Sequence, residues 1–155
     1  MVDIDGFLTP ERIVLGLRCA SKRQLFQELA DAASGITGID AAVILAALNQ
    51  REKLGTTGIG EGIAIPHARV KDLAQLVGLF ARMAVPVDYD ALDDAPVDLV
   101  FLLLAPEEAN NAQLKALARI ARLLRDPEIC ARLRTEQDPA QVYELLTGRR
   151  AGGTA

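Results

Sequence analysis

The order of apolar and polar positions along the chain predicts a mixed α/β fold, because stretches with helical spacing alternate with short runs that are typical of strands. Residues 12–18, R-I-V-L-G-L-R, predict a first strand. Residues 76–87 are rich in apolar and β-branched side chains and predict further strands, with Pro86 at a bend or a sheet edge. The almost continuously apolar run 97–105 predicts a strand that is buried on both faces of the sheet.

Two helices are predicted between the first strand and the middle of the chain. Ser21 and Gln24 form a capping box at the start of the first helix, and Gly35 is expected to end it. Asp40 is expected to cap the second helix, which ends near Leu54. The apolar faces follow helical spacing and consist of Leu25, Leu29 and Ala32 in the first helix and Val43, Ile44, Ala47 and Leu48 in the second.

Three more helices are predicted in the last third of the chain. The pairs Asp126-Pro127 and Asp138-Pro139 each read as an N-cap followed by proline at the first helical position, and Gly148 is expected to end the last helix. The helix before them has a predicted apolar face of Leu114, Leu117, Ala118, Ala121 and Leu124. The fold class is therefore a single α/β domain over residues 1–150, a mixed sheet of about five strands flanked by about five helices, followed by a flexible tail at 151–155.

Composition and charge narrow the function classes. The chain has 155 residues and a net charge of −4, and no run of Lys and Arg marks a nucleic-acid surface. The apolar run 99–106 is too short to cross a bilayer, and the acidic N-terminus has no signal-peptide pattern, so we expect a cytoplasmic protein with no membrane insertion. Cys19 and Cys130 are expected to be reduced thiols, with a redox role as the alternative, and one histidine cannot complete a zinc site with them.

The single histidine, His67, lies where a glycine-rich segment meets a short apolar strand. Residues 55–62 contain four glycines and two threonines and predict a loop, while residues 63–65 predict the strand that leads into Pro66. Pro66 stiffens the backbone before the imidazole, and glycine amides can form a nest that binds an anion. Arg51 precedes the loop and could fold back over the same site to bind a phosphoryl group with two N–H donors.

Each feature around His67 also has a purely structural interpretation. Glycine-rich segments are mostly turns, and Arg51 could be a favourable charge at a helix C-terminus. The chemistry nevertheless suits a histidine that acts alone, because a neutral imidazole can attack a phosphoryl group and pass it onward. Backbone amides of Gly60 and Gly62, a hydroxyl of Thr56 or Thr57, and the arginine would stabilise the charge, and neither a metal nor a cofactor is required.

The segment at residues 52–68, E-K-L-G-T-T-G-I-G-E-G-I-A-I-P-H-A, resembles the phosphorylation-site signature of mannitol/fructose-type IIA proteins of the bacterial phosphotransferase system. The segments R-E-K-L-G-T-T-G-I-G, P-V-D-L-V-F-L-L-L-A-P and I-C-A-R-L-R resemble the nitrogen-regulatory branch of that family. The resemblance implies a mixed sheet flanked by helices, with His67 as the phosphoacceptor through Nε2 and Arg51 as the active-site arginine. It also implies a phosphotransferase component whose donor is an HPr-like carrier charged through an enzyme I homologue.

One position departs from the pattern of the family. Many relatives carry a second active-site histidine at the start of the helix after the buried strand, and the corresponding residue here is Gln113, in N-N-A-Q-L-K. Glutamine can donate a hydrogen bond to phosphate but cannot become a cation, and Gln113 could also be a solvated helix residue.

Three functional hypotheses follow. The first is a regulatory phosphocarrier whose phosphorylation state controls binding to other proteins. The second is a sugar-specific fructose or mannitol IIA that passes the phosphoryl group to a IIB or permease subunit. The third is a non-catalytic binding module in which the glycine-rich segment is only structural. The local chemistry at His67 is the same in the first two, so the sequence of the site does not separate them.

Overall fold

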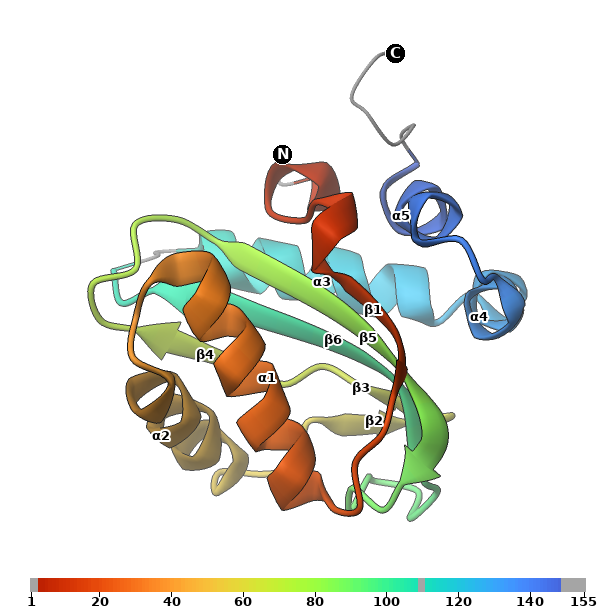
Figure 1. The fold of residues 1–155 in the computed structure, drawn as a ribbon, viewed down its shortest axis with the longest axis horizontal. Coiled ribbons are helices and arrows are strands. Elements are labelled where there is room, and N and C mark those ends of the chain that lie inside the picture. Colours follow the sequence, from red (N-terminus) through yellow and green to blue (C-terminus); the bar gives the residue numbers. More distant parts are fainter. Residues whose placement is uncertain (1–2, 109–110, 149–155) are drawn as a thin grey trace.

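The computed structural model describes residues 3–108 and 111–148, which fold around a six-stranded mixed sheet (Figure 1). The strand order is β1-β5-β6-β3-β2, and β4 pairs with β6 beyond the end of β3. The strands are β1 (Ile13–Leu17), β2 (Gly58–Gly60), β3 (Ile63–Ala64), β4 (His67–Val70), β5 (Val77–Val87) and β6 (Val97–Pro106). The prediction of a mixed α/β domain is confirmed, with one strand more than the sequence indicated.

Strand β6 lies at the centre of this sheet because its side chains are apolar on both faces. It runs antiparallel to β5 and parallel to β3 and β4 along its other edge. Every side chain from Leu99 to Ala105 is fully buried, which confirms the predicted doubly covered strand. The stretch 76–87 forms one long strand rather than several, and Pro86 lies where the pairing of β5 with β6 shifts register, between Arg82 and Val87.

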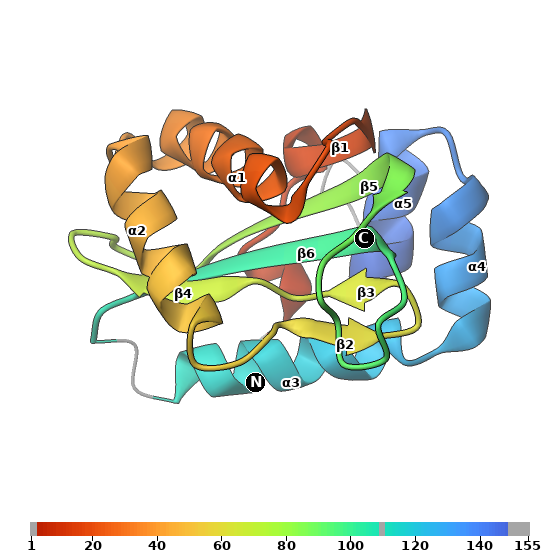
Figure 2. The same cartoon turned by 90° about the horizontal axis from the view of Figure 1, so that it is seen from below.

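In the part of the chain that the structure describes, five α-helices cover the two faces of the sheet (Figure 2). Helices α1 and α2 pack on one face, and α3, α4 and α5 cover the other together with the short 3-10 helices at Ile4–Gly6 and Pro10–Arg12. The helices are α1 (Lys22–Thr37), α2 (Ala41–Glu52), α3 (Ala112–Leu124), α4 (Pro127–Thr135) and α5 (Pro139–Thr147). Each face of the sheet therefore has its own apolar core.

The predicted helix caps are confirmed except at Gly35 and in one half of the capping box, where Gln24 accepts from the N–H of Ala20 instead of Ser21. The side chains of Ser21, Asp40, Asp126 and Asp138 each accept a hydrogen bond from a backbone N–H of the helix that follows. The predicted C-cap at Gly35 is wrong, because α1 continues to Thr37 and ends at Gly38, whose φ of 77° is left-handed. The helix has no reason to stop at Gly35, since its apolar positions extend to Ala33 and Ile36.

The buried faces of α2 and α3 differ from the predicted ones. Val43 is 46% exposed and Leu114 is 63% exposed, although both were expected to be buried. The buried positions of α3 are Gln113, Ala116, Ile120 and Leu124, so this helix is rotated by about one residue relative to the apolar spacing. The rotation turns the amide of Gln113 inward, where its oxygen accepts a hydrogen bond from Arg69 of β4.

Residues 58–60, which were expected to belong to a loop, form strand β2. This strand pairs antiparallel with β3 through a two-residue turn at Glu61 and Gly62, and both turn residues have positive φ, 59° and 80°. Gly58 packs so tightly that a Cβ there would lie 2.8 Å from the Cβ of Ala91. The glycines thus build a packed hairpin, which contradicts the prediction of an irregular loop.

The remaining expectations concern the chain ends and the thiols. The predicted tail 151–155 lies outside the described residues, as do 149 and 150, so the boundary at residue 150 stays a prediction. Cys19 is half-buried and Cys130 is buried, and both are free thiols. Within residues 3–108 and 111–148, no helix is both long and apolar enough to span a membrane.

Candidate functional site

His67 is the first residue of β4, at the point where the strand lying along β6 is interrupted. The residue pairing with β6 stops after Ala64 and resumes at His67, opposite Leu103. Between them Pro66 has no N–H to donate, and its carbonyl accepts a hydrogen bond from the N–H of Leu103. Ala68 and Val70 pack into the core beneath α1 and α2. Side chains alternate along a strand, so the half-buried imidazole of His67 faces the side of the sheet that α3 covers.

Hydrogen bonds fix the tautomer of this imidazole. Its Nδ1 lies 2.8 Å from the carbonyl oxygen of Ile65, and because a carbonyl only accepts, Nδ1 carries the proton. The Nε2 atom accepts a hydrogen bond of 3.1 Å from Nε of Arg51. The lone pair that remains for chemistry is therefore on Nε2, and it points toward a cation.

The surroundings also keep His67 neutral. Burial lowers the pKa of the imidazole below its ordinary value of 6.5, and the charge of Arg51 lowers it further. The hydrogen bond to the Ile65 carbonyl and the charge of Glu52 act in the opposite direction without reversing the shift. At neutral pH the ring is an uncharged base with an available lone pair, as a nucleophile requires.

Arg51 reaches His67 from the last turn of α2. Its Nε donates to His67, while its Nη1 donates to the carbonyl oxygen of Gly55 at 2.9 Å. The structure thus brings together the two residues that the sequence analysis placed in one site, although they are 16 positions apart. The guanidinium of Arg51 is thus hydrogen-bonded to the imidazole, and its role toward a phosphoryl group stays a prediction.

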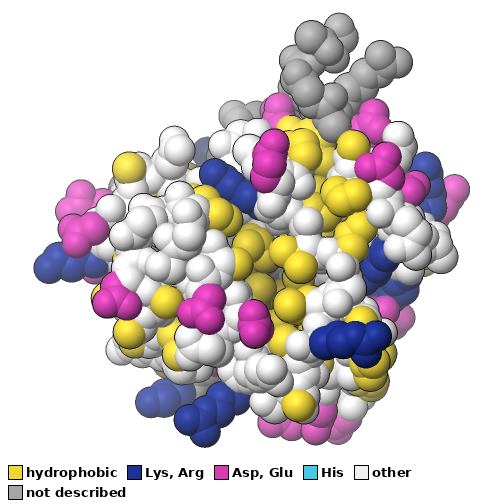
Figure 3. Space-filling view, in the orientation of Figure 1, with side chains coloured by type: hydrophobic (Ala, Val, Ile, Leu, Met, Phe, Trp, Pro, Cys, Tyr) yellow, Lys and Arg dark blue, Asp and Glu magenta, His cyan; other side chains and the backbone are white. Residues whose placement is uncertain are grey.

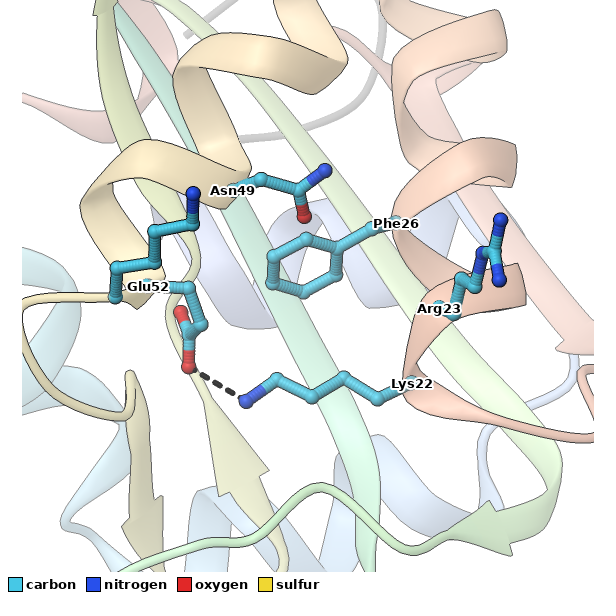
Figure 4. Close-up of a pocket in the computed structure, with 6 residues that line it drawn as sticks. Lys22, Arg23, Phe26, Asn49 and Glu52 are labelled. Atoms are coloured by element: carbon cyan, nitrogen blue, oxygen red, sulfur yellow. Dashed lines mark hydrogen bonds and ion pairs between the residues drawn. The ribbon is translucent and has the colours of Figure 1, made fainter.

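Glu52, the residue after Arg51, is part of a partly buried polar network that was not predicted from the sequence. Its carboxylate accepts hydrogen bonds from Nζ of Lys22 at 2.8 Å, from the backbone N–H of Thr57 at 2.8 Å and from the hydroxyl of Thr57 at 2.7 Å. Figure 4 shows the Lys22–Glu52 pair bridging α1 and α2, where both residues line a pocket together with Phe26. Burial alone would raise the pKa of Glu52, but these hydrogen bonds outweigh it and hold the pKa below the ordinary value of 4.5.

This network fixes the segment between α2 and β2. The hydroxyl of Thr57 also lies 2.7 Å from the hydroxyl of Tyr89, and Nζ of Lys22 sits 4.3 Å from the centre of the Tyr89 ring. The hydrogen bonds between Glu52 and Thr57 tie the two ends of this segment together. The end of α2 that carries Arg51 therefore has a defined position. Glu52 begins the motif at residues 52–68, but its partners are Lys22 of α1 and Thr57 of the segment before β2, and the local pattern does not indicate the contact with α1.

The residues predicted to surround a phosphoryl group on His67 do not all lie near it. Thr57 is 3% exposed, and its hydroxyl is hydrogen-bonded to Glu52 and Tyr89, so its part in the structure is to hold the segment after α2 in place. Thr56 accepts a hydrogen bond from the N–H of Gly58 through its hydroxyl, and its role toward an anion stays a prediction. The expectation that Gly60 and Gly62 surround the histidine is wrong.

The two glycines lie at the opposite end of β3. Ile63 pairs with Leu99 and His67 pairs with Leu103, so the hairpin turn is about 13 Å or more from His67 along β6. A Cβ on Gly60 would meet the carboxylate of Asp93, and one on Gly62 would meet Arg134 and Asp98. The glycines are needed for the turn and for these close contacts, and not for an anion beside His67.

Gln113 lies in the first turn of α3 and is only 7% exposed, so the interpretation as a solvated helix residue is wrong. Its Oε1 accepts a hydrogen bond of 3.0 Å from Nε of Arg69, which is two residues beyond His67 on β4. Figure 2 shows β4 between α2 and the first turn of α3. The site thus consists of a strand flanked by a helix C-terminus and a helix N-terminus.

This arrangement suits attack by a neutral imidazole on an anionic electrophile. The N–H of Arg51 that is bonded to Nε2 could turn to an oxygen of the incoming group. The guanidinium would then stabilise the negative charge of that group. No histidine is visible on the face drawn in Figure 3. Within the described part of the chain, no three His, Cys, Asp or Glu residues are grouped as a metal site.

Comparison with known proteins gives a family match over almost the whole chain. The family model described as phosphoenolpyruvate-dependent sugar phosphotransferase system, EIIA 2, matches residues 6–148. A nitrogen regulatory protein of Bradyrhizobium diazoefficiens is 50% identical over 143 residues, which cover 92% of this chain and 94% of that protein.

Two solved structures share the fold. The nitrogen regulatory protein IIA-Ntr of Neisseria meningitidis superposes with a TM-score of 0.89 at 37% identity, covering 93% of this chain and 99% of its own. The mannitol IIA of Escherichia coli superposes with a TM-score of 0.76 at 26% identity, covering 90% of this chain and 99% of its own. Likeness to the regulatory protein is therefore greater than likeness to the sugar-specific one.

Proposed function

The chain belongs to the EIIA 2 family of the phosphoenolpyruvate-dependent sugar phosphotransferase system, and from this premise we propose that His67 is the phosphoacceptor of a phosphocarrier with a nitrogen-regulatory role. The observation that carries the proposal is the state of the imidazole. Its Nδ1 proton is held by the Ile65 carbonyl and its Nε2 lone pair meets Arg51, in a site where the pKa is lowered.

The transfer step needs no external base. The Nε2 lone pair of His67 forms a new N–P bond while the N–P bond to a histidine of the donor breaks, and the donor imidazole leaves with that electron pair. The Nδ1 proton of His67 stays hydrogen-bonded to the Ile65 carbonyl, so the cationic ring of the phosphorylated state is stabilised there. Arg51 turns its donors onto the phosphoryl oxygens, which lowers the barrier by stabilising charge.

The donor in this proposal is an HPr-like carrier, and the protein is a phosphotransferase component acting in the cytoplasm. Two exposed leucines adjoin site residues in the chain, Leu54 three residues after Arg51 and Leu114 next to Gln113. They are 83% and 63% exposed, as expected for apolar contacts of a docking protein. A phosphoryl dianion added on His67 changes the charge of the site, which is how a regulated target would distinguish the two states.

A sugar-specific role is the second candidate, because the fold and the match to a mannitol IIA are common to both branches. In that case a IIB protein would accept the phosphoryl group from His67. The two roles are separated by mixing the phosphorylated protein with purified fructose- and mannitol-type IIB domains. Transfer to a IIB domain at a catalytic rate supports the sugar-specific role, and phosphorylation that persists beside both domains supports the regulatory one.

Intact mass spectrometry tests the phosphoacceptor directly. The chain is incubated with phosphoenolpyruvate, an enzyme I homologue and an HPr-like carrier, and we expect the mass of one phosphoryl group to be added. The added mass should be absent in His67→Gln, which keeps a hydrogen-bonding side chain but has no nucleophilic nitrogen. Because the chain has no other histidine, phosphohistidine formation in the variant is impossible, and an unchanged added mass would refute the assignment.

A further inference from the structure

We propose that Arg69 is a second cation that contacts the phosphoryl group on His67, and that Gln113 is the residue that positions it. This inference rests on the proposed function of His67. The two residues are joined by a hydrogen bond of 3.0 Å, which Nε of Arg69 donates to Oε1 of Gln113.

The strand geometry puts Arg69 beside the nucleophile. His67 and Arg69 are separated by one residue of β4, so their side chains leave the same face about 7 Å apart. The residues between and after them, Ala68 and Val70, are buried on the opposite face. Arg51 approaches the imidazole from the end of α2, so the two guanidinium groups come from different elements to one edge of β4.

Gln113 has the chemistry of an orienting group. A neutral amide that is only 7% exposed needs a partner, and its carbonyl oxygen accepts the Nε–H of Arg69. A guanidinium is planar and has five N–H donors, and the bond to Gln113 occupies one of them and fixes the plane of the group. Glutamine adds no charge, so the positive charge of this pair resides entirely on Arg69.

The inward rotation of α3 supports this arrangement. The helix exposes Leu114 at 63% while it buries Gln113, which reverses the preference of these two side chains for water. The buried polar contact with Arg69 is the interaction that Gln113 gains in this orientation. A helix N-terminus with its positive dipole end is brought to the same place, which also favours a dianion.

The test measures the rate of phosphoryl transfer from the phosphorylated HPr-like carrier by quenched flow, separating maximal rate from apparent affinity for the carrier. We expect Arg69→Ala to lower the maximal rate about 100-fold, the effect of removing a charged donor from a transition state. Arg69→Lys should recover part of the loss, because it keeps the charge but not the planar fork. Arg132→Ala, which removes the same charge from the exposed face of α4, is the matched control and should transfer at the wild-type rate.

Gln113 is tested by a double-mutant cycle. If it acts only through Arg69, Gln113→Ala should slow transfer about 10-fold in the wild type and have no effect in Arg69→Ala. Additive effects of the two changes would refute the positioning role, and a wild-type rate for Arg69→Ala would refute the contact with the phosphoryl group. If Arg69→Ala does not fold, Arg69→Met, which keeps the aliphatic length, is judged by the same criterion.

These outcomes are distinguishable from failure of the proposed function. If the wild-type chain is not phosphorylated at all, His67 is not the acceptor and both proposals fall. If the wild type accepts the group and Arg69→Ala accepts it equally fast, only the inference about Arg69 falls.

Discussion

Replacement of Arg51 tests how the site activates its histidine. In the structure, Nε of Arg51 lies 3.1 Å from Nε2 of His67, the atom that is proposed to form the new N–P bond. In Arg51→Ala the phosphoryl oxygens lose the N–H donors of the guanidinium. Removal of one donor of this kind costs about 100- to 1000-fold in rate, equivalent to about 2.7 to 4 kcal/mol of transition-state stabilisation. Arg51→Lys should recover about 10-fold of this loss, because the point charge remains while the two-donor geometry is lost.

Arg51→Ala should also raise the pKa of His67. Burial is the largest cause of the lowered pKa and the charge of Arg51 also lowers it, so removal of Arg51 raises the pKa toward its ordinary value of 6.5. The acceptor rate of Arg51→Ala should therefore fall at a higher pH than that of the wild type as the solution is acidified. Proton NMR measures this directly, since the only imidazole signals in the chain belong to His67.

The reasoning is refuted by a clear pair of results. Arg51→Ala that transfers at the wild-type rate, with the His67 titration unmoved, would reduce Arg51 to a charge at the end of α2. A loss of rate from misfolding is excluded by far-UV circular dichroism and urea denaturation. The variant loses an exposed hydrogen bond to Gly55 and a half-buried one to His67, so we expect its free energy of unfolding to fall by no more than about 2 kcal/mol.

Two further predictions concern stability. Glu52→Gln removes the charge that accepts from Lys22 and Thr57, and should lower the free energy of unfolding by about 2 kcal/mol at pH 7. Because the folded pKa of Glu52 lies below 4.5, this contribution is present above pH 4.5 and is lost as the pH falls through the folded pKa, so urea denaturation should find the variant and wild type converging in acid. Arg82 is 9% exposed and donates three hydrogen bonds to the end of α4 and the turn after it, so Arg82→Met should destabilise the protein by about 2 to 4 kcal/mol. An equal loss in Arg132→Met would mean that these buried bonds contribute nothing beyond charge.

The local order of the chain determined most of the secondary structure. Ser21, Asp40, Asp126 and Asp138 were recognised as caps because a capping bond spans two or three residues, within reach of any local pattern. The central strand β6 was recognised for a related reason. Only a strand covered on both faces carries so continuous an apolar run.

Glycine was harder to interpret from the sequence. The same residue type serves a helix interior at Gly35, a left-handed C-cap at Gly38 and a hairpin turn at Gly62. What distinguishes these positions is the sign of φ and the contacts that surround the backbone, and neither is written in a run of glycines. The prediction of an anion-binding glycine nest failed for this reason.

The sequence by itself determined the chemistry available to this protein: one histidine, an arginine before a glycine-rich segment, and a motif that resembles a phosphorylation site. Only the tertiary structure decided which groups meet that histidine. Arg51 does so because α2 ends at the edge of β4, and Gln113 turns inward because Arg69 lies two residues along the strand. Glu52, Thr57 and Tyr89 form one network that joins the end of α2 to the segments before β2 and after β5. Apart from the Glu52–Thr57 contact, these contacts join positions 16 to 44 residues apart, and they depend on sheet register and helix rotation rather than on local pattern.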